Sequence, residues 1–233
     1  MVAIVTGSSK GIGFAIAKAF VSRGMQVTLT ARKEDELREA AAALGSDSHV
    51  HTVRADVRNP ADADRLVSDT VQRFGGVDVL VNNAGIGRFA NVADLSIQDW
   101  QQVVETNVSG VFYCCRAVIP VMKRRGGGYI VNISSLAGKN PFAGGAAYCA
   151  SKSALNAFSE ALMQEVRYDN IRVSYVMPGS VATGFADRGP GGAAEWKVAP
   201  EEVAEVVVDL VTSNPRSLVS RVELRPSRPP RKG

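Results

Sequence analysis

The sequence has little cysteine and histidine, and it has no long apolar run. Three cysteines (Cys114, Cys115, Cys149) and two histidines stand among 233 residues. Three irregularly spaced thiols are too few for a disulfide framework or a thiolate metal site, so we expect reduced thiols and no metal. No apolar stretch is long enough to span a bilayer, and no secretory signal pattern opens the chain. We therefore expect a cytoplasmic protein that does not contact membranes.

The sequence also has fewer acidic than basic residues, with 23 Asp and Glu against 27 Lys and Arg, which gives a net charge of +4. The surplus lies at the end of the chain, because residues from Arg216 onward carry six bases and one acid. No aromatic residues alternate with these bases, and no DNA-binding motif accompanies them, so we expect no nucleic-acid partner. The basic, proline-rich residues 226–233 are expected to form an extended, poorly ordered tail.

Seven apolar runs rich in β-branched residues alternate with segments of helical spacing. This alternation predicts an α/β protein with a parallel sheet, in one domain over residues 1–225. Two Gly-rich segments, 136–147 and the proposed substrate loop 179–199, are candidates for the rim of a substrate site. The expected strands are Val2–Thr6, Val27–Ala31, Val50–Arg54, Val77–Val81, Tyr129–Ile133, Val173–Met177 and Leu218–Leu224.

A glycine-rich turn, Thr6–Gly13, links the first expected strand to the first expected helix. Glycines there let the backbone approach a pyrophosphate, and the helix N-terminus supplies N–H donors. The second strand then ends at Thr30-Ala31-Arg32-Lys33, where an NAD site would place an acid on the ribose 2′-hydroxyl. Because Arg32 and Lys10 are cations, a 2′-phosphate and hence NADP(H) is favoured.

A second motif, Tyr148-Cys149-Ala150-Ser151-Lys152, opens a later helix after Ser134-Ser135. Spacing of four places Tyr148 and Lys152 on one helix face. A neighbouring ammonium is expected to lower the pKa of the phenol toward the range in which it exchanges protons efficiently. The pair alone occurs on many helices by chance, so its weight comes from the other motifs.

Together these motifs resemble the short-chain dehydrogenase/reductase family from Val2 to about Glu223. The resemblance implies a Rossmann-type, doubly wound, seven-stranded parallel sheet of order 3-2-1-4-5-6-7 with helices on both faces. It makes Tyr148 the acid–base residue, Ser135 rather than Ser134 the holder of the substrate oxygen, Lys152 the partner of the nicotinamide ribose, and Asn107 the holder of a relay water. The cofactor-binding residues that it implies are Gly7, Ser9, Lys10, Gly11, Ile12, Gly13, Arg32, Asp56, Val57, Asn83, Ala84, Gly85, Tyr148, Lys152, Pro178, Gly179, Val181 and Thr183.

The resemblance implies an NADP(H)-dependent oxidoreductase acting on a small-molecule carbonyl or secondary alcohol. Residues 219–226 lack the Gly-rich ending of many ketoacyl reductases, which leaves 3-hydroxy acid and general ketone reductases open. An acyl carrier protein or acyl thioester stays open as a partner, and the family's habit implies a homodimer or homotetramer through helices near Ile97 and Tyr148. The alternative is a catalytically silent NADP-binding sensor or scaffold, although all four catalytic positions are filled.

Overall fold

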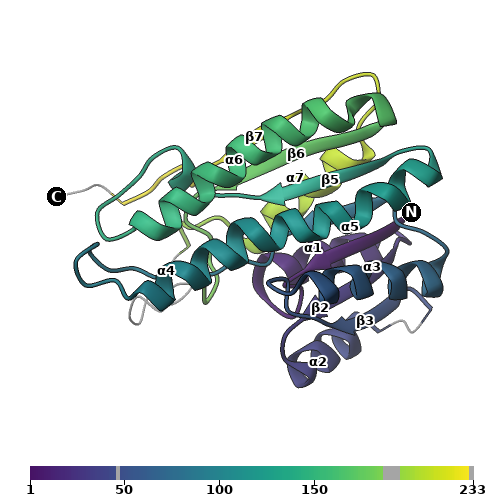
Figure 1. Cartoon of the computed structure of the whole chain (residues 1–233), viewed down its shortest axis with the longest axis horizontal. Helices are drawn as coiled ribbons and strands as arrows, with labels where there is room; N and C mark the ends of the chain where they lie inside the picture. The colour runs from purple at the N-terminus through teal and green to yellow at the C-terminus, as the bar shows by residue number, and fades with distance from the viewer. Residues whose placement is uncertain (46–47, 186–194, 231–233) are drawn as a thin grey trace.

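The computed structural model describes residues 1–45, 48–185 and 195–230 (Figure 1). Its seven strands pair in parallel in the order β3-β2-β1-β4-β5-β6-β7, which confirms the predicted Rossmann-type sheet. The strands are β1 (Val2–Thr6), β2 (Gln26–Ala31), β3 (Val50–Arg54), β4 (Val79–Asn82), β5 (Gly128–Ile133), β6 (Ile171–Pro178) and β7 (Arg221–Leu224).

Helices cover both faces of the sheet and create two apolar cores. Side chains that alternate along each strand feed the two cores, so Ala3 and Val5 pack on one face while Ile4 packs on the other. In Figure 1, α5 and α6 lie in front of the sheet and α7 lies behind it. One core packs against α1 (Gly11–Val21), α2 (Glu34–Leu44) and α7 (Pro200–Thr212); the other packs against α3 (Pro60–Phe74), α5 (Gly110–Arg125) and α6 (Ala146–Val166).

Strand β7 is shorter than its apolar pattern predicts, because it begins at Arg221 instead of Leu218. It lies at the edge of the sheet and pairs only with β6 among the described strands. Leu218 and Val219 are exposed, so the apolar pattern there does not report burial in the sheet. An edge strand buries fewer of its side chains than a central one, which weakens the match between pattern and pairing.

The parallel arrangement brings the carboxyl ends of β1, β2, β4, β5 and β6 to one edge of the sheet. A buried polar chain ties this region to α6, because the Asn82 amide donates to Asn132 (2.9 Å) and the Asn132 amide donates to Ser159 (2.8 Å). Helix α4 (Ile97–Val104) leads into α5 through a single π-turn, Glu105–Ser109. No helix in the described ranges is both long and apolar enough to cross a bilayer.

Candidate active site

A cavity of about 1110 Å³ opens at the carboxyl edge of the sheet. This volume lies just above the usual range for small-molecule sites, which suits a dinucleotide bound together with a substrate. Every predicted catalytic and cofactor-binding residue lines it except Gly13 and Asn107. Motifs that are far apart in the sequence therefore form one site.

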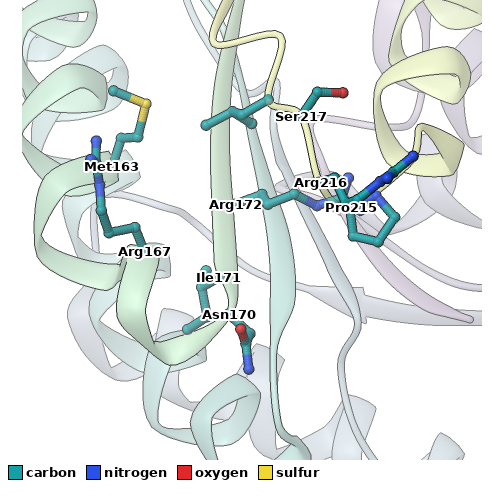
Figure 2. Close-up of a pocket in the computed structure, with 9 residues that line it drawn as sticks. Met163, Arg167, Asn170, Ile171, Arg172, Pro215, Arg216 and Ser217 are labelled. Carbon is teal, nitrogen blue, oxygen red and sulfur yellow. The ribbon is translucent and has the colours of Figure 1, made fainter.

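A smaller cavity of about 380 Å³ lies at the opposite edge, where β6 begins at Ile171. It is lined by Arg167, Arg172 and Arg216 but by none of the motif residues. Figure 2 shows the Arg167 and Arg216 side chains on either side of the strand that carries Arg172. Since the motif residues line the large cavity and none of them lines this smaller one, the large cavity is the candidate active site.

The glycine turn is shaped by close backbone packing. Gly7 and Gly11 have φ values of +63° and +58°, which favour glycine. A Cβ on Gly13 would lie 2.4 Å from both the carbonyl oxygen of Gly7 and the Nδ2 atom of Asn83. The Asn83 amide in turn donates to the carbonyl oxygens of Thr6 and Gly7 (2.9 and 3.0 Å). Gly13 thus supports the turn from behind without lining the cavity.

The residues around this turn fit a phosphorylated dinucleotide. The turn precedes the N-terminus of α1, whose free N–H groups and dipole attract phosphate. Lys10, Arg32 and Lys33 line the same part of the cavity and supply positive charge. The hydroxyl of Thr30, another lining residue, is buried and has no hydrogen-bond partner within the described part of the chain. This orphaned hydroxyl and the neighbouring cations fit a polar, negatively charged ligand.

A carboxylate that the sequence analysis missed, Glu36, lies among these cations. Its oxygens lie 2.9 Å from Lys33 Nζ and 3.6 Å from Lys10 Nζ, and one accepts a 3.3 Å hydrogen bond from the Ser9 hydroxyl. The hydrogen bond from Lys33 is the main cause that lowers the pKa of Glu36. The sequence signal that could have found Glu36 is an acid about twenty residues beyond the glycine turn. Glu36 was missed because it lies in helix α2, whereas such an acid is expected at the end of β2.

Asp56, predicted to contact adenine, has its carboxylate held by a neighbour. Arg58 donates to both Asp56 oxygens, the shortest distance being 2.6 Å, and these bonds lower the pKa of Asp56. The Asp56 backbone N–H donates to Asp62 (2.8 Å). Asp56 is therefore fixed in place at the cavity wall, next to Val57.

Tyr148 and Lys152 lie close together near the start of α6. Lys152 is buried, its Nζ lies 5.8 Å from the centre of the Tyr148 ring, and it donates to the carbonyl oxygen of Ile133 (2.8 Å). Burial lowers the pKa of Lys152 to about 8. Burial also raises the pKa of Tyr148, and a hydrogen bond with Ser135 opposes that rise only in part.

The predicted lowering of the Tyr148 pKa is therefore wrong for this structure. Helical spacing correctly placed the two side chains on one face, but the ammonium group points to the backbone of β5. Desolvation of the buried phenol has the largest effect on its pKa and raises it, because burial disfavours the charged form.

The two adjacent serines point in different directions. Both serines line the cavity, but only Ser135 hydrogen-bonds Tyr148, and its hydroxyl also accepts a hydrogen bond from the N–H of Ala137 (3.1 Å). The Ser134 hydroxyl instead donates to the Asn156 side chain (2.5 Å) on α6. This geometry favours Ser135 as the group that meets a substrate oxygen.

Asn107 lies in the π-turn and is fully buried. Its amide donates to the carbonyl oxygen of Ile86 (2.9 Å) and to Ser151 (3.0 Å), and its oxygen accepts from the N–H of Ile86 (2.9 Å). These bonds hold the segment after β4 beside the start of α6. The relay role of Asn107 stays a prediction.

Aromatic rings surround the phenol on the substrate side. The ring centres of Phe89 and Phe185 each lie 5.7 Å from that of Tyr148, and Phe142 lies 6.0 Å from Phe89. Trp196 also lines the cavity. The sequence analysis missed Phe89 and two prolines of the expected tail, Pro226 and Pro229, which line the cavity as well. Within the predicted substrate loop, residues 186–194 lie outside the described residues.

All three cysteines are free and buried. Desolvation raises the pKa of Cys114 to about 12 and raises the pKa of Cys115 as well. Cys149 adjoins Tyr148 but does not line the cavity. Over the described ranges, no cluster of three or more His, Cys, Asp or Glu side chains forms a site for a metal ion.

The chain resembles known proteins both in sequence and in structure. The profile of the short chain dehydrogenase family matches residues 1–189. An uncharacterized oxidoreductase of Staphylococcus haemolyticus is 34% identical over 225 residues, which cover 97% of this chain and 96% of that protein. A serine dehydrogenase in its closed form with NADP+ superposes with a TM-score of 0.89 at 32% identity, covering 96% and 94% of the two chains. An alcohol dehydrogenase of the archaeon Thermococcus sibiricus, complexed with 5-hydroxy-NADP, gives a TM-score of 0.90 at 31% identity, with 99% of each chain covered.

Proposed function

The chain belongs to the short-chain dehydrogenase family and is an oxidoreductase, and on that basis we propose that it interconverts a carbonyl and a secondary alcohol with NADP(H). The observation that carries the proposal is a single cavity lined both by Ser135, Tyr148 and Lys152 and by the glycine turn with its cations Lys10 and Arg32.

The positive charge of the cavity beside the glycine turn favours NADP(H) over NAD(H). NADP differs from NAD by a 2′-phosphate, and cations favour a phosphate where an acid would favour a hydroxyl. Lys10, Arg32 and Lys33 line the cavity beside the glycine turn. Two solved relatives are complexed with NADP+ or a modified NADP, which supports this preference. When bound, the nicotinamide supplies the hydride chemistry, and the protein supplies binding and proton transfer.

In this proposal the proton at the substrate oxygen comes from the Tyr148 hydroxyl. The raised pKa keeps Tyr148 protonated at neutral pH, which suits an acid in carbonyl reduction. The Ser135 hydroxyl, which already bonds Tyr148, would hold the same oxygen and orient it. Lys152, with a pKa of about 8, stays mostly charged at pH 7 and would hold the ribose hydroxyls. Asn107 would support the path that returns a proton to Lys152.

We propose a ketone with an apolar substituent as the substrate class. Phe89, Phe142 and Phe185 give the substrate side of the cavity an aromatic wall. Aromatic rings bind apolar and ring-bearing groups better than small polar ones. The wall favours aryl or alkyl ketones over a substrate as small and polar as serine, although Lys197 also lines the cavity.

The test is a parallel screen of NADPH and NADH oxidation with aryl ketones, alkyl ketones, 3-keto acids and acyl thioesters. We expect turnover with apolar ketones and a preference for NADPH. Tyr148→Phe serves as the control, since it should lower turnover by about 10²–10⁴-fold while leaving NADPH binding intact. NADPH binding without turnover on any substrate would favour the silent sensor instead.

We also propose that the chain forms a homo-oligomer and works in the cytoplasm. Ile97, Trp100 and Phe112, on α4 and α5, are 77%, 43% and 47% exposed. Large exposed apolar side chains that gather on neighbouring elements are typical of protein interfaces. Light scattering on the purified protein would give the number of subunits.

A further inference from the structure

Glu36 is an acid at a place where the proposed cofactor brings negative charge. Its carboxylate contacts Lys33 (2.9 Å), Lys10 (3.6 Å) and Ser9 (3.3 Å), and all four residues line the large cavity. Ser9 and Lys10 belong to the glycine turn, whereas Lys33 precedes α2. One carboxylate thus links the two segments that would hold an adenosine ribose.

We propose that Glu36 sets the cofactor selectivity of this protein by acting as an internal counter-anion for Lys10 and Lys33. The inference rests on the proposed function. A 2′-phosphate would need the same two ammonium groups that Glu36 already neutralises. Its binding leaves the carboxylate beside a phosphate of like charge, and like charges at short range repel.

The same carboxylate has the opposite effect on a cofactor without the 2′-phosphate. Carboxylates accept hydrogen bonds from ribose hydroxyls in dinucleotide sites. Glu36 therefore weakens the binding of NADP(H), which carries the 2′-phosphate, but does not weaken the binding of NAD(H). The wild-type protein then discriminates less between the two cofactors than Lys10, Arg32 and Lys33 alone would allow.

A purely structural role for Glu36 is the competing explanation, because acids near a helix N-terminus stabilise the helix dipole. Glu34 and Asp35 provide the same charge in the same turn. Glu34 does not line the cavity and lies two positions before Glu36, so it points to a different side of the helix. Glu34→Gln is thus a matched control that removes an equal charge from the same turn.

The experiment measures binding of adenosine 2′,5′-bisphosphate and of 5′-AMP by isothermal titration calorimetry, with wild type, Glu36→Gln and Glu34→Gln. These probes differ only by the 2′-phosphate, and neither depends on knowing the substrate. For Glu36→Gln we expect about fivefold tighter binding of the bisphosphate, which corresponds to about 1 kcal/mol. The affinity for 5′-AMP should stay unchanged or fall, and Glu34→Gln should behave as wild type for both probes. Melting curves check that each variant is folded.

Each outcome bears on one of the two proposals. If wild type prefers the bisphosphate but Glu36→Gln changes nothing, or if Glu34→Gln changes it equally, the role of Glu36 is refuted while the NADP(H) proposal stands. If Glu36→Gln binds the bisphosphate about fivefold tighter than the wild type does, and Glu34→Gln does not, the inference is supported. If wild type and both variants bind neither probe nor NADPH, the cofactor proposal fails and the inference fails with it.

Discussion

Replacing Lys152 with methionine should increase the stability of the protein while destroying its activity. Lys152 is fully buried, and desolvation lowers its pKa from 10.5 to about 8. A pKa lowered by one unit corresponds to about 1.4 kcal/mol against the charged form in the folded state. The buried charge of Lys152 therefore destabilises the folded state by about 3 kcal/mol at pH 7. Methionine has a similar length and no charge, but it leaves the carbonyl of Ile133 without its donor, a loss of about 1–3 kcal/mol. The net gain at pH 7 is then roughly 0–2 kcal/mol.

The pH dependence of the unfolding free energy separates the effect of the buried charge from the effect of the lost hydrogen bond to the Ile133 carbonyl. Below pH 8 both the folded and the unfolded states carry the proton on Lys152, so the folded state bears the full penalty. Between pH 8 and 10.5 the unfolded state holds more protons, so the stability of the wild type rises with pH. Above 10.5 both states are neutral and the penalty is gone.

Urea unfolding at pH 7 and pH 10.5 tests this reasoning, at one fixed protein concentration because subunit association would also contribute. The difference in unfolding free energy between Lys152→Met and wild type should fall by about 3 kcal/mol between the two pH values. Lys18→Met, which replaces an exposed lysine on α1, is the control and should show no such trend. A pH-independent difference for Lys152→Met would refute the assignment of a desolvated ammonium group.

The remaining predictions concern the site and the assembly. Tyr148→Phe should lower kcat by about 10²–10⁴ with the NADPH dissociation constant unchanged, as stopped-flow assays and fluorescence titration would show. Gly13→Ala should weaken NADPH binding at least tenfold, because the new Cβ would lie 2.4 Å from the Gly7 oxygen; Gly24→Ala, strained but without a close neighbour, should not. Phe142→Ala should raise KM for aryl ketones by about tenfold through lost ring contact, with little change for acetone-sized substrates. Trp100→Glu should shift the protein to smaller assemblies in light scattering; an unchanged mass would exclude this face as the interface.

The fold could be predicted from the sequence because central parallel strands are buried on both faces. Their apolar runs therefore report burial directly, as in β1, where the predicted and observed bounds agree. This relation fails for the edge strand β7, which is not buried on both faces. Leu218 is exposed, so its apolar character does not report a place in the sheet. The glycine turn and the Tyr148 motif were found because their functions require fixed residue types at fixed spacing.

What sequence reasoning missed depends on how elements approach one another. Glu36 reaches Lys10 only because α2 starts beside the glycine turn, a contact between residues 26 positions apart. Phe89 joins the aromatic wall from the segment that follows β4, with no motif of its own. The sign of the Tyr148 pKa shift was missed because helical spacing gives proximity, whereas the degree of desolvation depends on the packed surroundings.

The burial of all three thiols makes the natural chain a suitable background for site-specific labelling. Thiolates react with maleimides and similar reagents. Burial keeps such reagents away from Cys114 and, by raising its pKa, keeps its thiol protonated. A cysteine introduced in place of exposed Ala143, beside the cavity-lining Phe142, would then react ahead of the native ones. A fluorophore at that point would report ligand entry at the rim of the cavity without the removal of any natural cysteine.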